Sequence, residues 1–124
     1  MISQPADIWR ALLRRSLLTA RKKRDAVRVS ALRSALAAID NAETPGAVEV
    51  VGRPAGAIAG AVAGVGATEV ARRELSDEQI RSLVRSEIDE RLSASEAFTS
   101  GGHTERAATL RAEATILAGL LGDV

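Results

Sequence analysis

Apolar residues recur every three or four positions through most of this chain, and the clearest run lies between Asp25 and Ala42. Four larger aliphatic residues form its stripe, and four alanines flank it: Val29, Leu32, Leu36 and Ile39, with Ala31, Ala35, Ala38 and Ala42. This spacing is typical of one face of an α-helix, and small flanking side chains let neighbouring helices approach closely. The pattern predicts a buried central helix.

A second amphipathic stretch precedes it, from Pro5 or Ala6 to Lys22 or Lys23. Proline is tolerated in a first helical turn, and Asp7 suits the positive end of the helix dipole. Its expected apolar face consists of Trp9, Leu12, Leu13, Leu17 and Ala20. The connection, Arg21 to Asp25, has room only for a tight reversal with Asp25 as N-cap, so these two helices should be antiparallel neighbours.

The start of a third helix is marked by a capping box, in which Ser76 is the N-cap and Gln79 stands three residues later. Leu75 and Ile80 can form the accompanying hydrophobic staple. The expected apolar face runs toward Phe98 and consists of Ile80, Leu83, Val84, Ile88, Leu92 and Ser95. On its surface, Arg85 with Asp89 and Glu87 with Arg91 are spaced to form ion pairs.

A fourth helix follows Gly101 and Gly102, with Thr104 as its expected cap. Its apolar residues again step by three and four: Ala107, Leu110, Ala114, Leu117 and Leu121. The four helices together predict an all-α, four-helix antiparallel bundle-like domain that covers residues 1–124.

Between the second and third helices lies a Gly/Ala-rich insert, residues 43–74, whose uncharged part is PAGAIAGAVAGVGAT. Glycines at 52, 56, 60 and 64 would share one side of a helix, but each glycine inside a helix costs about 1 kcal/mol relative to alanine. A flexible flap or linker is therefore the favoured interpretation. The uncharged run is shorter than the ~20 apolar residues that cross a bilayer, so no membrane span is expected.

The absence of cysteine and the sequence of the N-terminus limit the possible functions. The chain has no cysteine, which excludes disulfides, thiolate metal sites and cysteine nucleophiles. The N-terminus, MISQPADIW, has no basic segment leading into an apolar one, so nothing there resembles a secretion signal. We expect a soluble, cytoplasmic protein.

The formal net charge of +1 hides a split between the two parts of the chain. Residues 1–33 hold nine Arg or Lys against two Asp, whereas residues 34–124 hold eight against fourteen acids. The candidate binding residues are the cations around the first connection: Arg21, Lys22, Lys23, Arg24, Arg28 and Arg33. They can contact phosphates, as in tRNA, or they can be neutralised by packing against the acidic part and by the dipole of the first helix.

No group of residues in the sequence indicates a particular reaction or cofactor. His103 is the single histidine and follows two glycines in a turn, so a metal site would lack ligands. Glu87 and Glu90 can share one side of the third helix with Asp89 pointing elsewhere, and pairing with arginines explains them better than acid–base chemistry. Trp9 and Phe98 are the only aromatic residues and stand at expected core positions, so stacking of bases on an aromatic platform is not expected.

Three segments resemble the GatB/YqeY family, small YqeY-like proteins related to the C-terminal region of the B subunit of the tRNA-dependent amidotransferase. They are ARKKRDAVRVSALRSALAAIDNAE (20–43), RELSDEQIRSLVRSEIDERLSASEAF (73–98) and GGHTERAATLRAEATIL (101–117), in the family's order. Arg28, Arg33, Asn41, Glu87 and Arg91 match polar letters of the family pattern. His103 stands where the family usually has arginine, and the Gly/Ala-rich insert is longer than the family's connector.

The resemblance implies an accessory module linked to tRNA or to the amidotransferase machinery, a carbon–nitrogen ligase that uses glutamine as amide donor. It implies no catalysis by this chain alone, because the ammonia-generating and activating chemistry belongs to domains that this chain is not expected to contain. The family's second small helical domain, which in the amidotransferase subunit is the tail associated with tRNA, is also expected to be absent. The alternative is a protein–protein interaction module that uses the basic corner or the insert. Partner identity and oligomeric state are left open by the sequence.

Overall fold

The computed structural model describes residues 4–44 and 73–122, and the central part of the Gly/Ala-rich insert lies outside these residues. The described residues form four helices: α1 (Pro5–Lys22), α2 (Ala26–Glu43), α5 (Asp77–Ser100) and α6 (Thr104–Leu120). They contain no strand. The all-α prediction is confirmed, and none of these helices is both long and apolar enough to cross a lipid bilayer.

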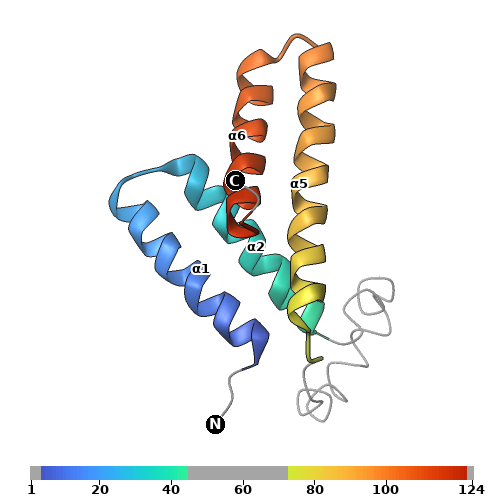
Figure 1. Ribbon diagram of the computed structural model, residues 1–124. Coiled ribbons are helices and arrows are strands. Elements are labelled where there is room, and N and C mark those ends of the chain that lie inside the picture. The colour runs from blue at the N-terminus through green and yellow to red at the C-terminus, as the bar shows by residue number, and fades with distance from the viewer. Residues whose placement is uncertain (1–3, 45–72, 123–124) are drawn as a thin grey trace, which may run out of the picture.

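The helices pair as two antiparallel hairpins, α1 with α2 and α5 with α6, and the two hairpins cross obliquely (Figure 1). α2 is the central element, because it packs against α1, α5 and α6. The far end of the α5–α6 hairpin extends beyond this crossing (Figure 1). At the ends of the insert, the backbone N–H of Arg73 donates to the carbonyl oxygen of Glu43 at 2.9 Å, which places the end of α2 beside the residues that lead into α5.

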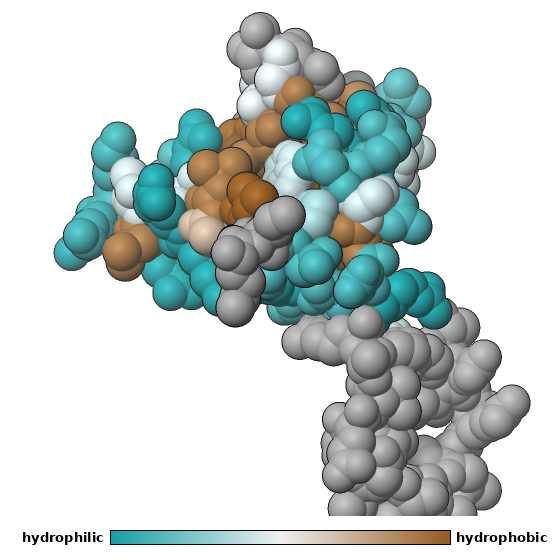
Figure 2. Space-filling model, turned by 60° about the horizontal axis from the view of Figure 1, so that its bottom comes forward, coloured by the Kyte–Doolittle hydropathy of each residue, from teal (hydrophilic) through white to brown (hydrophobic). Residues whose placement is uncertain are grey.

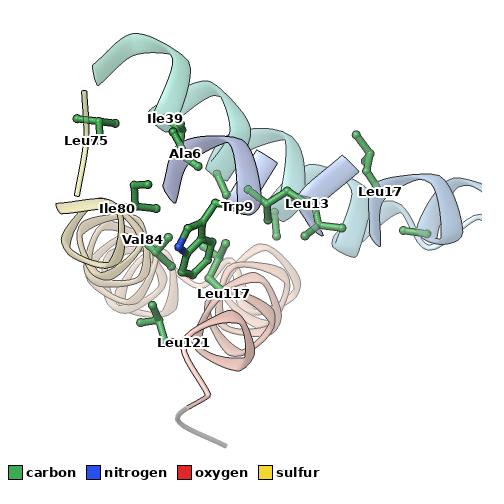
Figure 3. Close-up of a cluster of buried hydrophobic side chains, with 14 residues drawn as sticks. Ala6, Trp9, Leu13, Leu17, Ile39, Leu75, Ile80, Val84, Leu117 and Leu121 are labelled. Atoms are coloured by element: carbon green, nitrogen blue, oxygen red, sulfur yellow. The ribbon is translucent and has the colours of Figure 1, made fainter. Parts of the chain in front are cut away.

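The core lies where the hairpins cross, and Trp9 projects from α1 into its centre (Figure 3). The largest fully buried side chains come from all four helices: Leu13, Leu32, Ile39, Ile80, Val84 and Leu117. Ala31 and Ala35 of α2 are buried as well, which fits the expectation that small residues let helices approach. A fully buried aliphatic side chain contributes about 1.5–3 kcal/mol, so this shared cluster stabilises both hairpins.

Two helix starts follow the sequence prediction closely. The Ser76 hydroxyl accepts from the Gln79 N–H at 3.0 Å, and the Gln79 side chain accepts from the Ser76 N–H at 2.8 Å. At α2, a carboxylate oxygen of Asp25 accepts from the Arg28 N–H at 3.1 Å. At α6 the prediction is wrong, because His103 is the N-cap residue and Thr104 is the first helical residue.

Two expected core positions, Leu12 and Leu92, are exposed, and several others, Phe98 among them, are half-buried. Leu12 is 45% exposed because Leu13 takes the inward position on α1. Leu92 is 42% exposed, and the main hydrophobic cluster includes no α5 residue beyond Ile88. Phe98 is only half-buried and lies beside the α5–α6 turn, where its ring meets that of His103 edge-on at 5.9 Å between centroids.

Candidate anion-binding corner

The α1–α2 connection has a defined backbone geometry. The Asp25 N–H donates to the Ala20 carbonyl at 3.0 Å, and the Arg24 N–H donates to the Arg21 carbonyl at 3.1 Å. These bonds satisfy carbonyls at the end of α1, as in helix endings that use a left-handed residue. Arg24 is that residue, with φ of 57°, in a conformation that glycine adopts with less strain.

Six cations surround this connection, namely Arg21, Lys22, Lys23, Arg24, Arg28 and Arg33, and we call them the basic corner. All six are exposed. Arg28 pairs with Asp25, at 3.4 Å between Nε and Oδ2. Within residues 4–44 and 73–122, the other five form no ion pair, so most of the corner's charge faces solvent.

Two open hollows flank the connection and divide the corner. One, of about 670 Å³, is lined by Arg21, Arg24 and Arg33 with the hydroxyl groups of Ser30 and Ser34. In this hollow Arg33 of α2 lies beside Arg21, at the end of α1, and Arg24, in the connection. Ala26 and Val29 also line this open hollow, so the three arginines border a partly apolar surface. Guanidinium groups bind phosphate in a bidentate geometry.

The other hollow, of about 430 Å³, is lined by Lys23, Arg28 and Arg15 with Ser16 and Thr19, and by the carboxylate of Asp25 that pairs with Arg28. Arg15 was missed at the sequence level, although it stands two turns before Lys23 on the same helix. Lys22 lines neither hollow. The predicted patch is therefore two separate sets of donors on either side of one turn.

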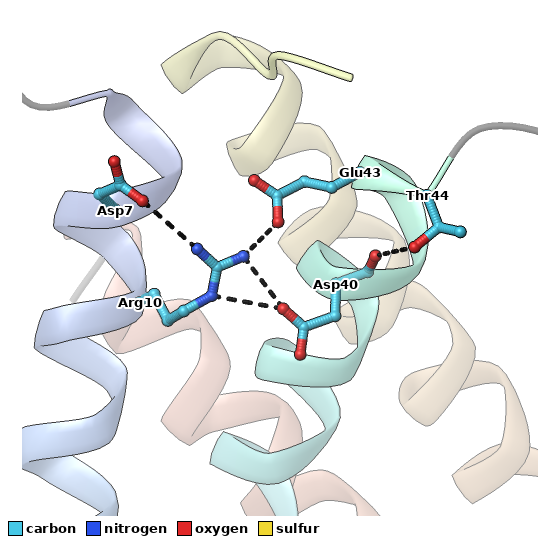
Figure 4. Close-up of polar contacts among 5 residues, drawn as sticks. All are labelled: Asp7, Arg10, Asp40, Glu43 and Thr44. Atoms are coloured by element: carbon cyan, nitrogen blue, oxygen red, sulfur yellow. Dashed lines mark hydrogen bonds and ion pairs between the residues drawn. The ribbon is translucent and has the colours of Figure 1, made fainter. Parts of the chain in front are cut away.

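Part of the basic segment is neutralised by acidic residues, but not at the corner. Arg10 of α1 pairs with Glu43 and with Asp40 of α2, the latter at 3.0 Å, and Asp7 lies 3.6 Å away (Figure 4). Burial disfavours the charge of Arg10, but its hydrogen bonds to Asp40 and Glu43 outweigh this effect and raise its pKa. Neutralisation by packing against acidic residues therefore occurs at Arg10, which was not among the predicted binding residues.

The family-matching residues Glu87 and Arg91 form a separate contact between α5 and α6. Arg91 donates to Glu87 at 3.0 Å and to Glu113 of α6 at 2.9 Å, and the side chains of Arg91 and Glu113 are only 12% and 10% exposed. Burial opposes the charge of Arg91, yet the bonds to Glu113 and Glu87 prevail and raise its pKa. Glu113 is the partner that spacing on a single helix could not reveal.

Asn41 does not join either group. It is exposed near the end of α2, sixteen residues after Asp25, which corresponds to about 24 Å along a helix. The expected pair of Arg85 with Asp89 is also absent from the described residues, because Arg85 pairs with Glu78 at 3.3 Å. The family-matching positions therefore lie at three places and do not form one site.

The described residues hold no group of three or more His, Cys, Asp or Glu placed to bind a metal ion. His103 is exposed in the α5–α6 turn, in agreement with its prediction as a surface residue. Asp89 and Glu90 are exposed on α5. Among the residues that the structure describes, the basic corner has the clearest ligand chemistry.

Comparisons with protein-family models, with curated proteins and with solved structures found no match for this chain.

Proposed function

We propose that this chain is a nucleic-acid-binding accessory module that contacts RNA phosphates, of tRNA in particular, through the basic corner. The observation that carries the proposal is the exposure of Arg21, Lys22, Lys23, Arg24 and Arg33 without ion-pair partners among the described residues. Clustered cations that remain solvated bind polyanions by releasing condensed counterions. The corner acts by charge and shape, and it reads no base sequence.

Two further observations favour phosphate over base recognition. Trp9 is 6% exposed and lies in the core, so it is not available to stack on a base. Ser30 and Ser34 add hydroxyl donors to the hollow that holds Arg21, Arg24 and Arg33. Such a set of donors suits a tetrahedral phosphate group.

The resemblance to the GatB/YqeY family supports tRNA as the RNA and supports a link to the tRNA-dependent amidotransferase machinery. In this proposal the chain is an accessory and does not catalyse amide transfer by itself. The family-matching residues Arg28 and Arg33 belong to the basic corner, whereas Arg91, which pairs with Glu87 on the same helix, joins α5 to Glu113 of α6. The proposal therefore assigns binding to the first pair and helix register to the second.

A binding titration with tRNA at low and high salt tests the proposal. For four phosphates neutralised, the slope of log K against log salt is roughly −3 to −4. The test variant replaces Arg21, Lys22, Lys23 and Arg24 by Gln. The matched control replaces four exposed arginines elsewhere, Arg73, Arg85, Arg106 and Arg111, by Gln.

Both variants change the net charge equally, so they separate a local site from general electrostatic attraction. We expect the corner variant to bind tRNA much more weakly at low salt, while the control variant keeps most of the affinity. Absence of binding by the unmodified protein at low salt would refute the proposal. Equal losses in the two variants would also refute it, because the attraction would then belong to the whole protein.

A further inference from the structure

The exposed large hydrophobic side chains of the described residues lie on only two helices. Ile8, Leu12 and Leu18 of α1 are 59%, 45% and 55% exposed, and Leu92 of α5 is 42% exposed. Single exposed aliphatic residues are common on protein surfaces. Here the exposed residues of α1 lie beside cations, whereas Leu92 of α5 lies beside carboxylates, so the two helix surfaces are complementary in charge.

The α1 outer face combines Ile8, Leu12 and Leu18 with the cations Arg14 and Arg15. Both arginines are exposed and form no ion pair with any residue of 4–44 or 73–122. Ile8, Ala11, Leu12 and Arg15 also line an open hollow of about 380 Å³, together with Asp7. Figure 2 shows hydrophobic surface bordered by hydrophilic residues on the side of the molecule that it presents.

The α5 outer face carries the opposite charge. Asp89 and Glu96 stand three residues before and four residues after Leu92, so all three share one side of the helix. Asp89, Glu90 and Glu96 are exposed, and none forms an ion pair within the part of the chain that the structure describes. The result is one exposed leucine between two solvated carboxylates.

We infer that the α1 outer face of one copy of this chain binds the α5 outer face of a second copy. Leu12 and Ile8 would meet Leu92, while Arg15, on the same side of α1, would face Asp89 and Glu96. Arg14 lies on the flank of this face, beside Leu18. Charge complementarity selects a second copy as the partner, because each copy carries both halves of the contact and a net charge of only +1. The contact is heterologous, so a pair of copies still has one free face of each kind and association continues to larger assemblies.

Sedimentation of the purified protein without RNA tests this inference. We expect the average mass to rise above 13.0 kDa as the protein concentration increases. Raising the salt from about 0.1 M to about 1 M shortens the Debye length from about 10 Å to about 3 Å and should reduce the association constant about tenfold. A mass of 13.0 kDa at every concentration would overturn the inference.

Two charge-reversed variants make the test specific to these faces. One variant carries Arg14→Glu and Arg15→Glu on α1, and the other carries Asp89→Arg and Glu96→Arg on α5. Each should be monomeric alone, since its two faces then have the same sign. An equimolar mixture should associate again, because the acidic α1 face of the first variant complements the basic α5 face of the second.

Recovery in the mixture also shows that both variants are folded, so loss of structure cannot imitate the result. Association that persists in the separate variants, or a mixture that stays monomeric, would overturn the inference. Arg15 lines one hollow of the basic corner, whereas Asp89 and Glu96 of α5 line neither hollow. RNA binding by the α5 variant therefore separates the two proposals: it should be unchanged when self-association is lost.

Discussion

The indole Nε1–H of Trp9 donates a hydrogen bond of 2.7 Å to a carboxylate oxygen of Asp77. This bond joins the second turn of α1 to the first residue of α5, and the two residues are 68 positions apart in the chain. Arg81 completes the contact: it donates to Asp77 at 2.9 Å and to the Leu121 carbonyl at 3.2 Å, and its guanidinium lies 5.6 Å from the Trp9 ring centroid. One polar cluster thus holds α1, the start of α5 and the end of α6 together.

Replacing Asp77 by Asn should lower the melting temperature at pH 7 by removing the charge that pairs with Arg81. The hydrogen bond from Trp9, and then that from Arg81, lowers the pKa of Asp77. A carboxylate with a lowered pKa in the folded state stabilises that state above its unfolded pKa, near 4, and loses this contribution as the pH falls through the folded pKa. The difference between the two proteins should therefore shrink below about pH 4.

Trp9 is the only tryptophan, so its fluorescence follows this unfolding transition directly. Melting curves of both proteins at a series of pH values make the measurement. A deficit of Asp77→Asn that stays constant down to pH 3 would contradict the assigned contact.

Replacing Arg91 by Met should destabilise the protein by roughly 2–3 kcal/mol, because two partly buried carboxylates lose their cation. Glu113 has no other ion-pair partner within the described residues. The double change of Arg91 and Glu113 to Met should recover much of the loss, since most of the buried charge is then removed. Urea denaturation gives the free energy of unfolding of both variants. A double variant that is less stable than Arg91→Met would contradict the view that buried unpaired charge causes the loss.

Replacing Arg24 by Gly should stabilise the protein by about 1 kcal/mol, because glycine adopts a positive φ without steric cost. Lys23→Gly is the matched control, since Lys23 has an ordinary right-handed conformation with φ of −84°. Glycine there should destabilise by up to about 1 kcal/mol. Equal effects of the two changes in urea denaturation would rule out strain at Arg24.

Replacing Ser76 by Ala should cost about 1 kcal/mol, because the Gln79 N–H then loses its acceptor. Ser93 is an exposed serine inside the same helix and serves as the control position. Ser93→Ala should be neutral or slightly stabilising, since alanine has the higher helix propensity. The two thermal unfolding midpoints should therefore move in different directions or by clearly different amounts.

Local signals in the sequence were sufficient for the helices. Ser76 with Gln79, Asp25 and the three-and-four spacing of apolar residues predicted the starts of α2 and α5 and most buried positions, although not the cap of α6. The predicted burial of Leu12 and of Leu92 was wrong for the same reason. Periodicity identifies the apolar side of a helix, but it does not show how far a neighbouring helix covers that side. That coverage depends on how α2 crosses the other hairpin.

The polar contacts between helices were harder to predict. Arg10 meets Asp40 and Glu43, and Arg91 meets Glu113, only because distant segments fold side by side. The grouping of Arg21 to Arg24 could be predicted, because these residues are adjacent in the chain and the connection has room only for one tight turn. Their division between two hollows could not be seen, since it depends on where α2 lies beside the end of α1.

The most direct test of the account is a map of the amide resonances of the labelled protein during a titration with tRNA at low salt. The basic corner predicts that the largest changes fall on residues 21–34, around both hollows, and that they disappear as salt is raised. Changes concentrated on α5 and α6, with residues 21–34 unaffected, would contradict the central claim.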